Sequence, residues 1–282
     1  MISCLFVSDL HGRVDRYEKL FDAIQSDRPS IVFLGGDLTP HFADASDYDD
    51  FLDGFISINL LRLRDSLGAE YPDVFAILGN DDPRAEEDKV RELDDRDLWH
   101  YVHYASREVA GHSVLGYSYV PPTPFLNKDW EKYDVSRYVP PGAVSPEDGI
   151  RSVPVEPRET RNATILNDLD RLTAEIDLTR AVMLFHTPPY DTKLDRAATD
   201  GMMVDHVPLD LHVGSIAVRR FIEKRQPLLT LHGHIHESAR VTGSWRDRIG
   251  RTHMFSAAHD GPELCVVRFD LEDLESAERT LL

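Results

Sequence analysis

The chain contains little cysteine, and its basic residues are far outnumbered by acidic ones. Cys4 and Cys265 are the only two cysteines in 282 residues, and each lies in an apolar, strand-like run. Their wide separation argues against a zinc cluster and against the disulfide framework of a secreted domain. Lysine and arginine number 31 against 50 aspartates and glutamates, which leaves a net charge of -19. General binding to nucleic acid is therefore not expected, because phosphate backbones are held by clustered basic side chains.

The sequence also lacks a long apolar run. No segment has the roughly 18 consecutive apolar residues of a membrane span. The first residues, MISCLFVSDLHG, have neither the basic start nor the long apolar core of a signal peptide. We expect a cytoplasmic protein with buried, reduced thiols and no membrane partner. The hydrophobic share of 41% is still sufficient for a sizeable core.

Short β-rich runs alternate with helical patterns along most of the chain. The expected elements are strand 2–8, helix 14–27, strand 31–36, a helical region ending near Leu67, strand 74–78 and a helix-like segment 85–93. A second set has strand 180–186, helix 214–226 and strand 227–234, followed by strand-like runs at 252–258 and 263–271. This alternation is typical of βαβ units, whose parallel strands are buried on both faces. The sequence therefore predicts an α/β fold.

Residues 117–157 interrupt the alternation with a proline-rich stretch. A structureless linker is one interpretation of this composition. The stretch also contains several tyrosines, Phe125 and Trp130, which favour an ordered loop packed on the body of the protein. Long ordered loops of this kind often cover functional sites.

Polar residues follow five of the predicted strands at the points where they end. These residues are Asp9 and His11, Asp37, Asn80 and Asp81, His186, and His234 and His236. In open α/β sheets the carboxyl ends of the strands line the ligand crevice, so these side chains are expected to converge. Imidazole and carboxylate together are typical ligands of Mn, Fe, Zn, Co or Ni, whereas calcium favours oxygen alone.

The motifs DLH and HIH each place two of these side chains two positions apart. On an extended backbone, that spacing directs both side chains to the same face, as two ligands of one ion require. The sequence therefore predicts extended backbone at both motifs and a transition-metal site at the strand ends.

Five motifs in this order, DLHG, GGDL, GND, FHTPP and GHIH, resemble the calcineurin-like metallophosphoesterase superfamily. The stretch from HTPPYDTKLD through HVGS to GHIHES further resembles a small prokaryotic branch with GND in place of GNH. The resemblance implies an αββα sandwich of two mixed β-sheets flanked by helices, with a dinuclear metal site at the carboxyl ends of the strands. We expect one domain over residues 1–282, with the proline-rich loop at 117–157 as an insertion.

The resemblance also implies a ligand set and a reaction. Asp9, His11 and His236 would hold one divalent transition metal, while Asn80, His186 and His234 would hold a second. Asp37 would bridge them. Manganese is favoured among the metals named above. The implied function is hydrolysis of a small phosphoester by a metal-bridging hydroxide, with a phosphodiester as the favoured substrate and Asp37 and Asp81 as catalytic carboxylates.

Several neighbouring residues have structural explanations. His232 matches no ligand position of the superfamily and is interpreted as structural, or as orienting a ligand. Asp82 and Pro83 are predicted to be the N-cap and first residue of a helix, with Glu86 and Glu87 in its first turn. Arg84 is expected to be solvated.

Asp81 stands where most relatives have a histidine that is their expected proton donor, and three roles are open. A protonated Asp81 could donate the proton itself, although nearby dications favour its ionised form. An ionised Asp81 would repel a dianionic monoester more than a monoanionic diester. Alternatively, a histidine from another loop replaces the missing imidazole, the candidates being His206, His212 and His259.

Two other functions compete with a phosphodiesterase. One is a metal-binding protein that is weakly catalytic and presents a surface to a partner. The other is a phosphomonoesterase or protein phosphatase. Metal analysis and a comparison of diester with monoester substrates distinguish them.

Overall fold

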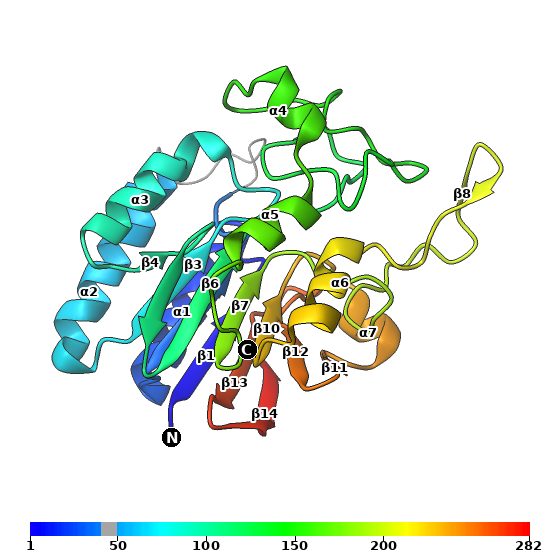
Figure 1. Ribbon diagram of the computed structural model, residues 1–282. Coiled ribbons are helices and arrows are strands. Elements are labelled where there is room, and N and C mark those ends of the chain that lie inside the picture. The colour runs from blue at the N-terminus through cyan, green and yellow to red at the C-terminus, as the bar shows by residue number, and fades with distance from the viewer. Residues whose placement is uncertain (41–49) are drawn as a thin grey trace.

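The computed structural model describes residues 1–40 and 50–282, and two six-stranded sheets form its centre (Figure 1). The strand order of the first sheet is β14 (Asp273–Leu281), β13 (Cys265–Asp270), β1 (Ser3–Val7), β2 (Ile31–Gly35), β3 (Asp73–Ile77) and β4 (His100–Tyr101). The order of the second is β11 (Arg246–Ile249), β12 (Thr252–Ser256), β10 (Leu229–His232), β7 (Ala181–Phe185), β6 (His112–Tyr117) and β5 (Ser106–Val109). A separate small hairpin pairs β8 (Met203–Val204) with β9 (Val207–Pro208).

Both large sheets are mixed, with parallel strands at their centres. Strands β1 to β4 are parallel, while β13 and β14 form an antiparallel edge. In the second sheet β12, β10, β7 and β6 are parallel, and β11 and β5 pair antiparallel at the two edges. All the central parallel strands therefore end at the same side of their sheet.

Alternate residues of each central strand enter different parts of the core. Phe6 and Phe33 pack in a cluster between the two sheets, whereas their neighbours Leu5 and Val32 pack on the other side, in the cluster that includes the helices. All four side chains are buried, and complete burial of each stabilises the fold by roughly 1.5–3 kcal/mol. This two-sided burial explains why the strands are continuous apolar runs.

Helices cover the outer faces of both sheets (Figure 1). The first sheet is covered by α1 (Val14–Asp27), α2 (Ile58–Leu67) and α3 (Glu87–Asp95), and the second by α5 (Ile165–Leu172) and α6 (Ile216–Arg225). Shorter helical segments are the π-helix Leu52–Ser57, the 3-10 turns Gly68–Glu70 and Arg84–Glu86, α4 (Pro157–Asn162) and α7 (Ser238–Thr242). The predicted αββα sandwich is confirmed. Among the described residues, no helix is both long and apolar enough to cross a membrane.

The proline-rich segment is packed, although it contains no regular element between β6 and α4. Trp130 is completely buried, and the adjacent ion pair between Lys128 and Glu131 is also inaccessible to solvent, with 2.5 Å between Lys128 Nζ and Glu131 Oε2. The expectation of an ordered loop holds for Trp130. Phe125 does not take part in this packing, since it lies in a bend and is 58% exposed.

Candidate metal centre

The segments that follow the strands do not remain extended, which corrects the geometry predicted for DLH and HIH. Strand β1 ends at Val7, and Asp9 and His11 then adopt positive φ angles of 57° and 49°. Asp37 and His234 do the same, with φ angles of 53° and 71°. Left-handed backbone is costly for residues other than glycine and concentrates at functional sites. The side chains thus converge because the backbone turns sharply, and not because they alternate along a strand.

One group of ligand atoms comes from the ends of β1 and β10. His11 Nε2 lies 3.3 Å from His236 Nε2, and His236 Nε2 lies 3.4 Å from Asp9 Oδ1. Two atoms that each bind one ion at about 2.1 Å are about 3.0–3.4 Å apart at octahedral or tetrahedral angles. The three side chains therefore have the spacing of ligands around a common cation.

A second group comes from the ends of β2, β3 and β7. His186 Nε2 lies 3.0 Å from Asn80 Oδ1 and 3.2 Å from Asp37 Oδ2. The other ring nitrogen, Nδ1, lies 2.8 Å from the carbonyl oxygen of Gly35. A proton on Nδ1 satisfies that carbonyl and leaves the lone pair of Nε2 directed into the centre, which is the arrangement of a metal-binding histidine.

Asp37 lies between the two groups. Its Oδ1 accepts a hydrogen bond of 2.8 Å from the backbone N–H of Asp81, while Oδ2 lies 3.2 Å from His186 and 3.9 Å from His11. A side-chain carbon on Gly79 would collide with Asp37, so the close approach of these loops requires a glycine there. This central position is compatible with the bridging role predicted for Asp37.

His234 is less closely engaged than the other predicted ligands. Its backbone N–H donates to Asp9 Oδ1 at 3.0 Å, and its ring centroid lies 5.2 Å from that of His186. Among the described His, Cys, Asp and Glu residues, the groups with ligand atoms within 4.8 Å of one another are Asp9–His11–His236, Asp9–Asp37–His186 and His11–Asp37–Asp81. His234 belongs to none of these groups.

The electrostatics of the centre favour a bound cation. Burial raises the pKa of the Asp37 carboxyl to about 7. Burial also opposes charge on His186, but the neighbouring Asp37 carboxylate raises the pKa of this imidazole to about 10. Burial opposes ionisation of Asp9 too, yet the hydrogen bond and charge of His236 hold its pKa below the usual range. Buried carboxylates that depend on nearby positive charge fit a site built for cations.

Asp82 is not a helix cap, contrary to the sequence prediction. The helix α3 begins at Glu87, with Glu86 at its N-cap position, and Pro83 has extended backbone before the 3-10 turn. Asp82 is instead completely buried. Its carboxylate accepts hydrogen bonds from three backbone N–H groups and from the hydroxyl of Thr39, the backbone donors being Leu38, Thr39 and Gly79.

The remaining predictions for single residues have mixed outcomes. His232 is a buried structural histidine, bonded to the carbonyl of Thr187 at 2.9 Å and stacked on Phe185. Arg84 is partly exposed, and its guanidinium carbon lies 5.6 Å from the ring centroid of Trp130. Cys4 and Cys265 are free and buried, as expected.

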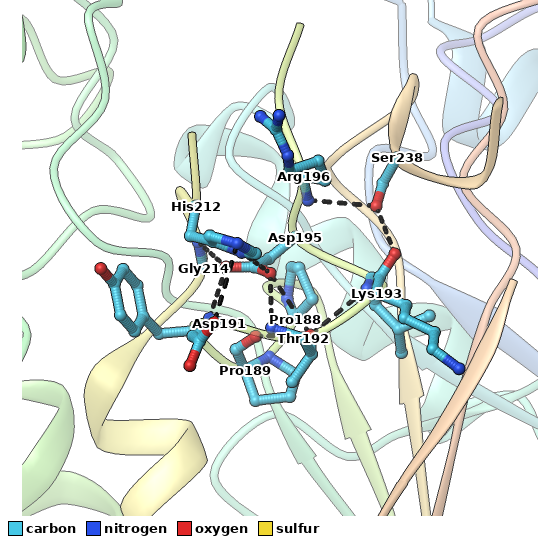
Figure 2. Close-up of polar contacts among 12 residues, drawn as sticks. Pro188, Pro189, Asp191, Thr192, Lys193, Asp195, Arg196, His212, Gly214 and Ser238 are labelled. Carbon is cyan, nitrogen blue, oxygen red and sulfur yellow. Dashed lines mark hydrogen bonds and ion pairs between the residues drawn. The ribbon is translucent and has the colours of Figure 1, made fainter. Parts of the chain in front are cut away.

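The three histidines considered as substitutes for the missing imidazole lie in different loops. His206 is exposed in the turn between β8 and β9, the hairpin that projects from the body in Figure 1. His259 Nε2 lies 3.0 Å from Glu263 Oε2. His212 is held by the buried carboxylate of Asp195, with 2.8 Å between His212 Nδ1 and Asp195 Oδ1 (Figure 2).

The carboxylate of Asp195 also holds the loop that follows His186. Asp195 also accepts backbone hydrogen bonds from Thr192 and Gly214, at 2.9 Å and 3.2 Å (Figure 2). Ser238, two residues after His236, accepts a hydrogen bond from the backbone N–H of Arg196. The bond to Ser238 ties the loop after β7 to the loop after β10, and both loops carry predicted ligands.

Sequence reasoning missed two residues that support the centre. Arg16 donates to the backbone carbonyl of Asp9 at 2.5 Å and to that of Gly261 at 2.6 Å. Asn127, in the proline-rich loop, donates from Nδ2 to the carbonyl of Asn80 at 3.0 Å. The sequence signal that could have identified Arg16 is an arginine in helical register with the apolar residues Leu20 and Ile24. Nothing in the local sequence distinguishes Asn127.

Two mixed sheets thus carry a cluster of aspartate and histidine, suited to a metal ion, at the carboxyl ends of their strands. The family model of calcineurin-like phosphoesterases matches residues 2–238, and the chain belongs to this family. The family depends on dinuclear metal centres and acts on phosphoesters, and the donor atoms described above fit such a centre.

The chain is also similar to solved structures. The protein TT1561 of Thermus thermophilus has a TM-score of 0.56 at 16% identity, over 99% of this chain and 98% of that one. An archaeal phosphodiesterase has a TM-score of 0.43 at 8% identity, over 99% of both chains. At such low identity, the likeness to TT1561 concerns the fold alone. No curated protein matches the chain.

Proposed function

We propose that this protein is a dinuclear metal-dependent phosphodiesterase. The observation that carries the proposal is the spacing of ligand atoms in two groups that meet at Asp37. Asp9, His11 and His236 would hold one ion, and Asn80, His186 and His234 the other. A mixed set of carboxylate, amide and imidazole without thiolate suits divalent transition metals, and manganese is the one proposed here. Free buried thiols are compatible with a reducing, cytoplasmic location.

The bound ions would supply Lewis acidity and would lower the pKa of a water molecule enough for it to ionise at neutral pH. The chain supplies the geometry for that chemistry. Asp37 holds one oxygen against the backbone of Asp81 and directs the other between His186 and His11. Gly35 holds the His186 ring in the orientation that exposes Nε2. Because these groups are fixed by loops from four strands, the centre is preorganised for a phosphoryl group.

The charge of the centre favours a diester over a monoester. Two dications carry a charge of +4, and the carboxylates of Asp9 and Asp37 together with the hydroxide nucleophile would reduce it to about +1. A small positive excess attracts a monoanionic diester. The carboxylate of Asp81 is 23% exposed, so it would repel the second charge of a monoester at short range.

The proposal is tested by loading the purified chain with Mn²⁺ and measuring bound metal and hydrolysis together. We expect two ions per chain and a higher kcat/KM for bis(para-nitrophenyl) phosphate than for para-nitrophenyl phosphate. His236→Ala should lose metal and activity, whereas the control His100→Ala, at the partly exposed start of β4, should keep both. A clear preference for the monoester would contradict the diester assignment, and two bound ions without any hydrolysis would favour a binding protein.

A further inference from the structure

The carboxylate of Asp81 contacts side chains from both groups of predicted ligands. Its Oδ1 accepts a hydrogen bond of 3.0 Å from Asn80 Nδ2, and its Oδ2 lies 3.6 Å from His11 Nδ1. The backbone N–H of the same residue donates to Asp37. One residue is thus adjacent to a ligand of each ion and to the carboxylate that bridges them.

The contact with Asn80 decides which end of that amide faces the centre. An amide binds a cation through its oxygen, because its nitrogen is a donor without an available lone pair. With Nδ2 bonded to Asp81, the Oδ1 of Asn80 is directed towards His186 Nε2, 3.0 Å away. Without an acceptor at Asp81, rotation of the amide would cost less and would present N–H groups to the ion.

The contact with His11 has the same consequence for an imidazole. At 3.6 Å this contact is longer than a hydrogen bond, so it acts through charge: the carboxylate favours the proton on the nearer nitrogen, Nδ1, and Nε2 then retains the lone pair. His11 Nε2 lies 3.3 Å from His236 Nε2, inside the first group of ligands. The carboxylate would also make the imidazole more basic, which strengthens its bond to a metal.

We propose that Asp81 is a positioning residue that orients Asn80 towards one ion and His11 towards the other, and that it is not the proton donor of the reaction. The contact with Asn80 is a hydrogen bond accepted by the carboxylate, and the contact with His11 is an ion-pair contact. This role of Asp81 rests on the proposed function only to the extent that the centre must bind metal.

The first experiment measures metal affinity and requires no catalysis. Mn²⁺ is titrated calorimetrically into the metal-free full-length chain, for the wild type, Asp81→Ala and the control Asp88→Ala, which removes an exposed acid of α3. We expect Asp81→Ala to weaken both sites by about 10–100-fold, as loss of residues that support metal ligands generally does, and Asp88→Ala to have no effect. Affinities within twofold of the wild type at both sites would overturn the proposal. Circular dichroism and urea unfolding verify that each variant is folded.

The second experiment separates positioning from proton donation. At saturating Mn²⁺, the kcat of Asp81→Asn and of the wild type is measured on two phosphodiesters. Methyl para-nitrophenyl phosphate has a good leaving group, and methyl benzyl phosphate has a poor one. A positioning residue predicts the same fold-loss in kcat for both substrates. A loss confined to the benzyl ester would identify a proton donor and overturn the assignment. If the wild type binds two ions but hydrolyses neither ester, the proposed function fails, and the affinity ratio still decides the role of Asp81.

Discussion

Asp82 Oδ1 accepts hydrogen bonds from both the backbone N–H and the hydroxyl of Thr39, each at 2.7 Å. The same carboxylate is bonded to the backbone of Leu38 and Gly79. These contacts join the loop after β2 to the loop after β3 and therefore set the separation of Asp37 and Asn80. Two adjacent carboxylates thus have different tasks: Asp82 joins the two loops, while Asp81 contacts the ligand side chains.

Replacement of Asp82 should damage both stability and metal binding. Asp82→Ala leaves three buried backbone N–H groups without their acceptor, so we expect the free energy of unfolding to fall by about 2–4 kcal/mol. Because the two loops then separate, Mn²⁺ affinity should fall as well. Urea unfolding and metal titration of the purified variant measure the two effects.

The control for this prediction is Asp88→Ala, which removes an exposed carboxylate and should change stability by less than about 0.5 kcal/mol. A variant at Asp82 that unfolds like the wild type and binds metal normally would show that the junction between the loops is dispensable.

Gly79→Ala should abolish metal binding through a steric effect. The added methyl group would collide with Asp37 Oδ1 and come within 2.7 Å of His186 Cε1. Both groups belong to the centre, so relief of the clash displaces predicted ligands. Metal content by elemental analysis should fall well below that of the wild type.

Gly111→Ala provides a comparison for Gly79→Ala. Gly111 has a positive φ of 75° but no atoms within 4 Å of an added side-chain carbon. This variant should lose about 1 kcal/mol of stability through backbone strain and retain its metal. Equal metal content in both alanine variants would contradict the predicted collision.

The buried pair in the proline-rich loop predicts a pH dependence of stability. Burial raises the pKa of the Glu131 carboxyl from 4.5 to about 7, against the attraction of the Lys128 ammonium. The folded chain therefore holds this proton more tightly than the unfolded chain. Its contribution to stability is complete below pH 4.5 and is lost as the pH rises to about 7.

Urea unfolding between these two pH values tests the role of Glu131. Glu131→Gln has no proton to release and should show a flatter pH dependence than the wild type, together with lower stability because Lys128 loses its partner. Glu18→Gln, on the exposed face of α1, should retain the wild-type slope. Parallel curves for the wild type and Glu131→Gln would exclude this carboxyl as the source.

Removal of metal should destabilise the fold. A ligand present at 100 times its Kd stabilises the folded state by about 2.7 kcal/mol, so chelation should lower the melting temperature measurably. Calcium at the same concentration as Mn²⁺ should restore less of it, because the centre contains several imidazoles and calcium prefers oxygen ligands. Identical melting curves with Mn²⁺, calcium and chelator would argue against a metal-binding centre.

Much of the fold could be predicted because the spacing of apolar residues within each short segment indicates whether that segment is a helix or a strand. The helix expected at 14–27 is α1, with the same boundaries, and the five strands that precede the polar motifs all occur. Strand β14 was missed, since its residues Asp273–Leu281 are mostly polar, and only Leu274 and Ala277 are buried within it. An edge strand with one solvated face carries a weak apolar signal.

The sequence by itself determined the order of the elements and the kind of residue at each strand end, because strands buried on both faces must be apolar until the chain turns. The tertiary structure decided how these polar atoms are paired. It buried Asp82 against Thr39, brought Asp81 beside His11, and placed Asn127 against the backbone of Asn80. Such pairs depend on the separation and direction of loops from different strands, and a hydrogen bond or metal ligand tolerates only a few tenths of an ångström. Residue type alone carries no information at that scale.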